Sequence, residues 1–244
     1  MSLASAIRLL TRFRIPGKET EKSERILFWF PVVGALLGCI SFLISLLPFP
    51  SSVRSVLVLI AGVYFTRAFH YDGVADLADG LGGGFTKERS LEIMRDSHIG
   101  AFGTIALILV FLLQYSLLLT VVDHPPMLIM VPALGRLAQV WAASTMDYAR
   151  EGEGMASSLV RRAKRHHALL PTLQIGLVVL LLSIMNSPYA IPTFVALVGG
   201  IVISTTILCL ISRKRLGGIT GDVLGSIEVF GETAALLCIV LALA

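Results

Sequence analysis

Long apolar runs dominate this chain and limit the folds open to it. Seven segments approach the length of about 20 residues that a helix needs to cross a hydrocarbon core of about 30 Å. They lie at residues 26–48, 53–69, 101–122, 126–146, 169–187, 190–212 and 231–244. Of the 244 residues, 55% are hydrophobic and 15% are charged, whereas a soluble domain has roughly 25% charged residues. The sequence therefore predicts a single all-α domain over residues 1–244, a polytopic bundle of about seven spans in the lipid bilayer.

Lysines and arginines are distributed unevenly between the loops that join these segments. They gather in the first 25 residues and near residues 70–99, 147–168 and 213–230, while the intervening loops contain only Arg54. Positively charged loops face the cytoplasm, so we expect a cytoplasmic N-terminus and three cytoplasmic loops that form the active face. Residues 1–25 are expected to lie at the interface as an amphipathic segment. A homo-oligomer is compatible with the sequence, and no nucleic-acid partner is expected.

Three aspartates lie close together in the first of these loops, within residues 70–84 (HYDGVADLADGLGGG). On a helix, the spacings of four and three residues place Asp72, Asp76 and Asp79 on one narrow face. Carboxylates this close repel one another unless a cation lies among them. Hard oxygen ligands suit Mg²⁺, which in turn suits a phosphorylated substrate. The segment predicts a metal-dependent membrane enzyme with these aspartates as ligands and catalytic groups.

The neighbours of the aspartates extend the expected site. Gly82, Gly83 and Gly84 lack side chains, so their backbone N–H groups are expected to approach substrate phosphates. His70 adjoins the acids and is expected to orient one of them. Asp96 ends a short helix at the start of the next apolar segment, where we expect a further metal ligand or a general base.

Two arginines and a second glycine-rich loop complete the candidate set. Arg136 lies inside an apolar segment, where an arginine faces either a polar cavity or a partner acid; the two interpretations are a substrate phosphate contact and a structural ion pair. Arg150 is expected to bind substrate. The loop GGITGDVLG (residues 217–225) carries Gly218 and Thr220 as substrate-binding candidates and Asp222 as a carboxylate from the far side of the site. The sequence leaves open which acid is the general base.

Four segments of this chain together resemble the cobalamin synthase family, the adenosylcobinamide-GDP ribazoletransferases. They are TRFRIP (residues 11–16), residues 70–84, LEIMRDSHIGAFG (residues 91–103) and residues 217–225. The resemblance implies a Mg²⁺-dependent enzyme in the bacterial inner membrane. Its substrates are adenosylcobinamide-GDP and α-ribazole or α-ribazole 5′-phosphate. The products are GMP and adenosylcobalamin or its 5′-phosphate.

Three other classes share parts of this pattern. Membrane prenyltransferases carry a motif like Asp72-x-x-x-Asp76, but they use a second acid pair, and Asp222 has no close acidic partner in the sequence. CDP-alcohol phosphotransferases open with Asp-Gly, but their Ala-Arg step is absent because Asp76 follows Ala75. A cation transporter is the non-enzyme alternative; such proteins place acids at the midplane within internal repeats, and we find no repeat.

Overall fold

The computed structural model is all-helical and describes residues 3–16, 24–152, 154, 156–185 and 190–243. The expected interfacial segment 1–25 falls partly outside these ranges, as does the end of the expected span 169–187. The helices are α1 (Leu3–Leu10), the 3-10 helix η1 (Glu24–Trp29), α2 (Phe30–Ser45), α3 (Ser51–Thr66), α4 (Phe69–Gly83), α5 (Lys87–Ile93), α6 (Ala101–Val121), α7 (Pro125–Thr145), α8 (Ser157–Arg162), the 3-10 helix η2 (Arg165–Ala168), α9 (Leu169–Met185), α10 (Ala190–Leu216) and α11 (Gly221–Leu243).

The described residues contain five helices that are long and apolar enough to cross a membrane. These are the joined η1 and α2, then α6, α7, α10 and α11. A sixth span arises if α3 and α4, which meet at 88°, are taken together. Helices occur at all seven places that the sequence indicates, but α3 has only 16 residues and α9 only 17. The polytopic helical class is confirmed, and the described ranges hold five or six candidate spans beside the expectation of about seven.

Helix α11 differs from the sequence expectation in its length. The segment 213–230 was expected to be a loop, followed by a span from residue 231. Instead, one helix of 23 residues begins at Gly221 and continues to Leu243. Glycines 225 and 231 do not interrupt it because they face neighbouring helices, where a small residue permits close packing. The acids of this segment therefore lie on a single rod.

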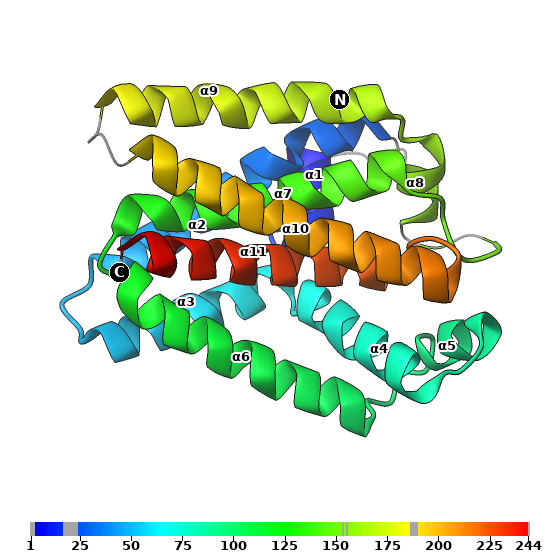
Figure 1. Cartoon of the computed structure of the whole chain (residues 1–244). Coiled ribbons are helices and arrows are strands. Elements are labelled where there is room, and N and C mark those ends of the chain that lie inside the picture. Colours follow the sequence, from blue (N-terminus) through cyan, green and yellow to red (C-terminus); the bar gives the residue numbers. More distant parts are fainter. Residues whose placement is uncertain (1–2, 17–23, 153, 155, 186–189, 244) are drawn as a thin grey trace.

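The bundle is centred on α11, which packs against α4, α6, α7 and α10. In Figure 1, α6 and α11 both begin at the right, where α4, α5 and α8 also lie. We call this end of the bundle the loop face. The amino-terminal α1 buries Ala6 and Leu10 and packs against η1 and α2. The described part of the amphipathic segment is thus docked on the protein.

A sharp corner joins α3 to α4. Arg67 and Ala68 have φ angles of 60° and 58°, so two consecutive residues with side chains adopt the left-handed conformation. This conformation costs L-residues on the order of 1–2 kcal/mol each. It turns the chain through 88° and directs α4 along the first turns of α6 and α11, where the predicted acids lie.

Candidate active site

The site is built where α4 meets the first turns of α11. A Cβ atom added at Gly73 would lie 2.6 Å from the backbone oxygen of Asp222, so only glycine permits this approach. The hydroxyl of Ser226 donates to the carbonyl of Gly73 at 2.9 Å and fixes the register of the two helices. As a result Asp76, one turn after Gly73, faces Asp222 across the helix contact. The predicted α4 helix and its proximity to Asp222 are both present.

Asp76 and its acidic neighbours are held close enough to repel one another. Partial burial, and then the carboxylates of Asp222 and Asp72, raise the pKa of Asp76 to about 7, and Arg150 opposes this shift. Asp79 contacts the start of α6, and Asp222 lies in the first turn of α11, so Asp76 lies at the loop face, on a helix that is not one of the five long enough to span by itself. A carboxylate surrounded by other acids in this way can bind a cation or keep a proton near neutral pH.

Arg150 is brought to the site by two paired loops. The backbone of Ala149 donates to Ile219 at 2.9 Å, and Ile219 donates to Asp147 at 2.8 Å. The backbones touch because Gly218 faces the carbonyl of Asp147, where a side chain would clash. Gly218 is therefore a packing residue here and does not face an open site.

The pairing of the loops places the Arg150 guanidinium 2.7 Å from the Asp222 carboxylate. Thr220 also donates to Asp222, at 3.1 Å, and the carbonyl of Met94 accepts a hydrogen bond from Arg150 at 3.1 Å. Within the described part of the chain, the Nε atom of Arg150 is buried and has no partner. The expected proximity of Arg150, Thr220 and Asp222 is thus observed, and the guanidinium retains an unused donor.

Asp79 contacts the first turn of helix α6. Its two carboxylate oxygens accept hydrogen bonds from the backbone N–H groups of Gly100 at 2.7 Å and Gly103 at 2.9 Å. These groups open helix α6, whose first N–H groups have no partner within the helix. Asp79 is therefore an N-cap supplied by another helix, and its negative charge complements the positive end of the α6 dipole.

Asp96 lies apart from the other acids. It is exposed in the segment between α5 and α6, and its carboxylate contacts Nδ1 of His98 at 2.7 Å. Hydrogen bonds from His98 lower the pKa of Asp96. In the described part of the chain, no three acidic, histidine or cysteine side chains form a ready metal site. Asp79 thus contacts the start of α6 and Asp96 contacts His98 of its own loop, and the set of Asp72, Asp76, Asp79 and Asp96 as metal ligands stays a prediction.

The glycines that end α4 pack against neighbouring helices. A side chain at Gly82 would meet the ring of Phe102 on α6, and one at Gly84 would meet Ser90 on α5. Gly83 is less crowded, since a Cβ atom added there would lie 3.3 Å from the side chain of Ile93. The N–H of Gly84 is bonded to Gly80 at 3.1 Å. The expected phosphate cradle is thus occupied by helix packing, with Gly83 as the most open member.

Arg136 forms an ion pair with two acids of α11. It is 2% exposed, and its guanidinium contacts the carboxylates of Glu228 and, at 2.6 Å, Glu232. The structural ion pair, rather than the substrate phosphate contact, is the interpretation that the structure supports. Nδ1 of His70 lies 3.3 Å from Glu228, so His70 orients a glutamate of α11 and not one of the aspartates.

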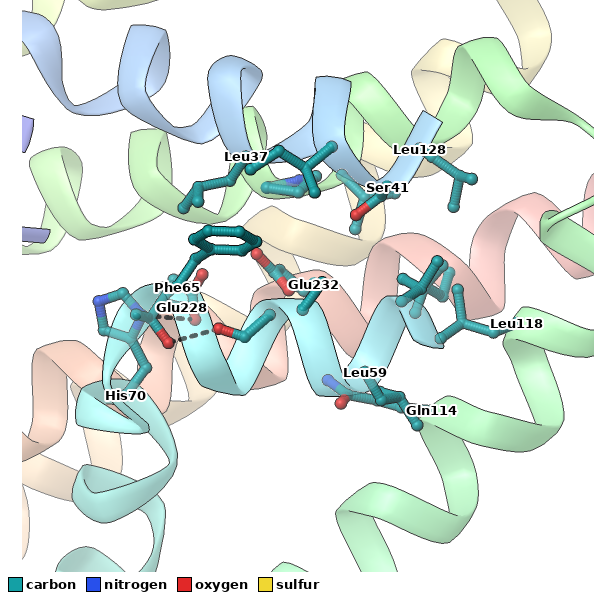
Figure 2. Close-up of a pocket in the computed structure, with 18 of the residues that line it drawn as sticks. Leu37, Ser41, Leu59, Phe65, His70, Gln114, Leu118, Leu128, Glu228 and Glu232 are labelled. Carbon is teal, nitrogen blue, oxygen red and sulfur yellow. Dashed lines mark hydrogen bonds and ion pairs between the residues drawn. The ribbon is translucent and has the colours of Figure 1, made fainter. Parts of the chain in front are cut away.

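These groups line a small cavity between the spans. The cavity has a volume of about 70 Å³, and Figure 2 shows His70, Glu228 and Glu232 among apolar side chains such as Leu37 and Phe65. Sequence reasoning did not identify Glu228 and Glu232 as partners of Arg136. The sequence signal that could have identified them is their spacing of four residues. On a continuous helix α11 this spacing places both glutamates on the face toward α7, where Arg136 lies.

The fold and the site define an integral-membrane enzyme with acidic and basic groups at one end of a helical bundle. The model of the cobalamin-5-phosphate synthase family matches residues 2–240 of the chain. The chain belongs to this family and is a transferase of cobalamin biosynthesis.

Curated relatives agree with this assignment over the full length. An adenosylcobinamide-GDP ribazoletransferase of Prosthecochloris aestuarii is 41% identical over 92% of this chain and 91% of its own length. The enzyme of the same name from Chlorobium phaeovibrioides is 39% identical over 94% and 93%. That of Syntrophobacter fumaroxidans is 35% identical over 95% of both chains. No solved structure matches the chain.

Proposed function

We propose that this enzyme transfers the phosphocobinamide group of adenosylcobinamide-GDP to the ribose hydroxyl of α-ribazole or its 5′-phosphate. The hydroxyl oxygen attacks the phosphorus that carries cobinamide. The bond from that phosphorus to the oxygen shared with GMP breaks, and the hydroxyl proton passes to a carboxylate. GMP leaves, and adenosylcobalamin or its 5′-phosphate forms. One observation carries the proposal. The side chains of Asp76, Asp222 and Arg150 lie close together, although they come from three segments that are far apart in the sequence.

Mg²⁺ is the proposed cofactor, with Asp72 and Asp76 as its protein ligands. Mg²⁺ commonly takes one or two carboxylates and completes its coordination with water and substrate phosphates, so a ready cage of three side chains is not required. The donors here are all oxygens, and the pKa of Asp76 is raised first by partial burial and then by the negative charges of Asp222 and Asp72. When bound, Mg²⁺ neutralises the charge of the diphosphate.

Arg150 is proposed to bind a diphosphate oxygen. Its guanidinium already offers one donor to Asp222, and the Nε donor has no partner within the described residues. Guanidinium groups bind phosphate through two parallel hydrogen bonds. Asp222 then holds Arg150 in the orientation that presents its remaining donors, and Thr220 fixes Asp222. Asp76 and Asp222 are the two acids placed to accept the hydroxyl proton.

The loop face is proposed to be cytoplasmic, in the inner membrane of a bacterium. The basic residues of the loops lie at this end: Arg161, Arg162, Lys164, Arg165, Arg213, Lys214 and Arg215. Such residues are retained on the cytoplasmic side during insertion. The nucleotide-activated substrate and the GMP product would then enter and leave on the cytoplasmic side.

GMP release by the purified protein in liposomes tests the proposal. The assay contains adenosylcobinamide-GDP and α-ribazole, with Mg²⁺ or with EDTA. We expect Mg²⁺-dependent GMP release with formation of a cobalamin, lost in Asp76→Asn. Glu92→Gln, which removes an exposed acid paired with Arg89, is the matched control and should remain active. Folded protein that releases no GMP would overturn the assignment, and equal release in EDTA would overturn the role of the metal.

A further inference from the structure

The amino-terminal segment forms a pocket that the proposed reaction does not use. Four arginines, Arg8, Arg12, Arg14 and Arg67, line a pocket of about 420 Å³ together with three other residues of the segment 11–15. We call it the arginine pocket. It joins the carboxyl end of α1 to the corner between α3 and α4, two parts of the chain more than 50 residues apart. The pocket is separate from the site formed by Asp76, Asp222 and Arg150.

The segment is fixed to α3 by specific contacts. The backbone of Arg12 donates to Phe65 at 2.8 Å, and the Phe13 ring stacks on Phe65 with a centroid distance of 5.2 Å. The guanidinium of Arg12 lies 3.8 Å from the centroid of the Tyr64 ring. These contacts fix the backbone of the segment and the side chain of Arg12 beside α3.

The strained corner supplies the fourth arginine. Arg67 has a φ angle of 60°, and its guanidinium donates to the carbonyls of Arg8 and Leu9, both at 3.3 Å. Glycine would adopt this backbone conformation without strain, yet the chain places an arginine there. Strained residues are concentrated at sites of binding and catalysis. The corner places the side chain of Arg67 at the arginine pocket.

Three of these arginines, Arg12, Arg14 and Arg67, carry charges that are not balanced by the acids that the structure describes. Among the described residues, no acidic side chain lines the pocket, and no ion pair joins Arg12, Arg14 or Arg67 to a carboxylate. Converging guanidinium groups repel one another and bind oxyanions, above all phosphate, through paired hydrogen bonds. We propose that the arginine pocket binds a phosphate group, either of a free phosphorylated metabolite or of a phospholipid headgroup at the membrane surface.

Phosphate binding by the full-length protein in neutral detergent with EDTA tests this inference. Inorganic phosphate is titrated at constant ionic strength set with chloride, and binding is followed by calorimetry and by the unfolding temperature. We expect phosphate to bind and stabilise the wild type and Arg162→Gln/Arg165→Gln, which removes two exposed arginines elsewhere on the loop face. Arg12→Gln/Arg14→Gln should weaken binding at least tenfold. Equal phosphate affinity in the pocket and control variants, or no binding to the wild type, would overturn the proposal.

Two further measurements make the result specific. Arg14→Gln alone removes a side chain from the pocket while leaving the contact of Arg12 with Tyr64, so a weakened affinity in this variant is not a consequence of misfolding. The phosphate titration is then repeated in nanodiscs of phosphatidylcholine with and without phosphatidylglycerol. Competition by phosphatidylglycerol identifies a lipid headgroup, and competition by α-ribazole 5′-phosphate identifies a metabolite. No turnover is measured, so a negative result here leaves the proposed reaction untouched.

Discussion

Arg150 and Asp222 form an ion pair at 2.7 Å across 72 residues of sequence. The pair depends on the contact between the loops at residues 147–149 and 218–219, and it lies beside Asp76 at the loop face. Because each partner orients the other, the two side chains act as one unit in the proposed site.

The first prediction concerns this pair. Arg150→Gln and Asp222→Asn should each reduce GMP release on the order of 10²-fold, which is the usual effect of removing one positioned charge from an active site. The double variant should be little worse than either single variant, because losses within one unit are not additive. Rates are measured in liposomes, with Arg89→Gln/Glu92→Gln as an exposed control pair. Losses that multiply would show that the two residues act independently.

The second prediction separates Asp79 from its neighbour Asp76. Asp79→Ala removes both acceptors from the first turn of α6 and should lower the free energy of unfolding by about 1–2 kcal/mol, as for the loss of a helix cap. Asp79→Asn keeps one acceptor and should lose about half as much. Thermal unfolding in detergent measures both, with the exposed Asp96→Ala as control. An unchanged unfolding temperature in Asp79→Ala would contradict the capping role.

The third prediction is the pH dependence that follows from Asp76. Its pKa is raised from 3.8 to about 7 in the folded protein, so the folded state favours the proton. The stability associated with that proton is present below pH 4 and is lost as the pH rises to about 7 and beyond. Without metal, Asp76→Asn should therefore unfold at a higher temperature than the wild type.

The difference in unfolding temperature between these two proteins should be larger at pH 8 than at pH 5. Both are measured in EDTA, and comparing the two proteins cancels the titration of all other groups. Added Mg²⁺ should stabilise the wild type and not Asp76→Asn. A difference that is independent of pH would rule out the raised pKa of Asp76.

The fourth prediction concerns Arg136. Arg136→Met leaves Glu228 and Glu232 without their cation inside the bundle and should destabilise the protein by about 3–5 kcal/mol, the cost of breaking a buried pair. Replacing both acids by glutamine in the same variant should restore much of the stability, since no unpaired charge then remains. Unfolding in detergent measures the series. A substrate-binding role for Arg136 would instead appear as a raised KM with unchanged stability.

Sequence periodicity predicted where the helices of this fold lie better than it predicted what individual residues do. Apolar runs located every long helix, and spacing placed the three aspartates on a helix. The role of Asp79 was not predictable in this way, because it depends on where the first N–H groups of α6 lie in space. Similarly, the contact of Arg136 with Glu228 was missed because residues 213–230 were interpreted as a loop, which placed Glu228 outside the spans and apart from Glu232.

The candidate site was predictable where function requires unusual residues. Asp76, Asp222 and Arg150 stand out from an apolar sequence, and the structure joins them. The glycines were less informative, since the pattern that suits phosphate binding also suits close helix packing, and only the positions of Phe102 and Ser90 distinguish the two. Residues 11–16 carried the family resemblance without any chemical assignment, and the structure places Arg12 and Arg14 of this segment in the arginine pocket.

The two acids that face each other at the loop face stand on elements that respond differently to the membrane. Asp222 begins a rod of 23 residues that continues without a break to Leu243, whereas Asp76 lies on α4, which leaves α3 at 88°. A spanning rod changes its tilt when the bilayer becomes thinner or thicker, and its end then shifts relative to α4. We therefore expect the separation of the carboxylates, and with it the rate of the enzyme, to change with the length of the surrounding acyl chains.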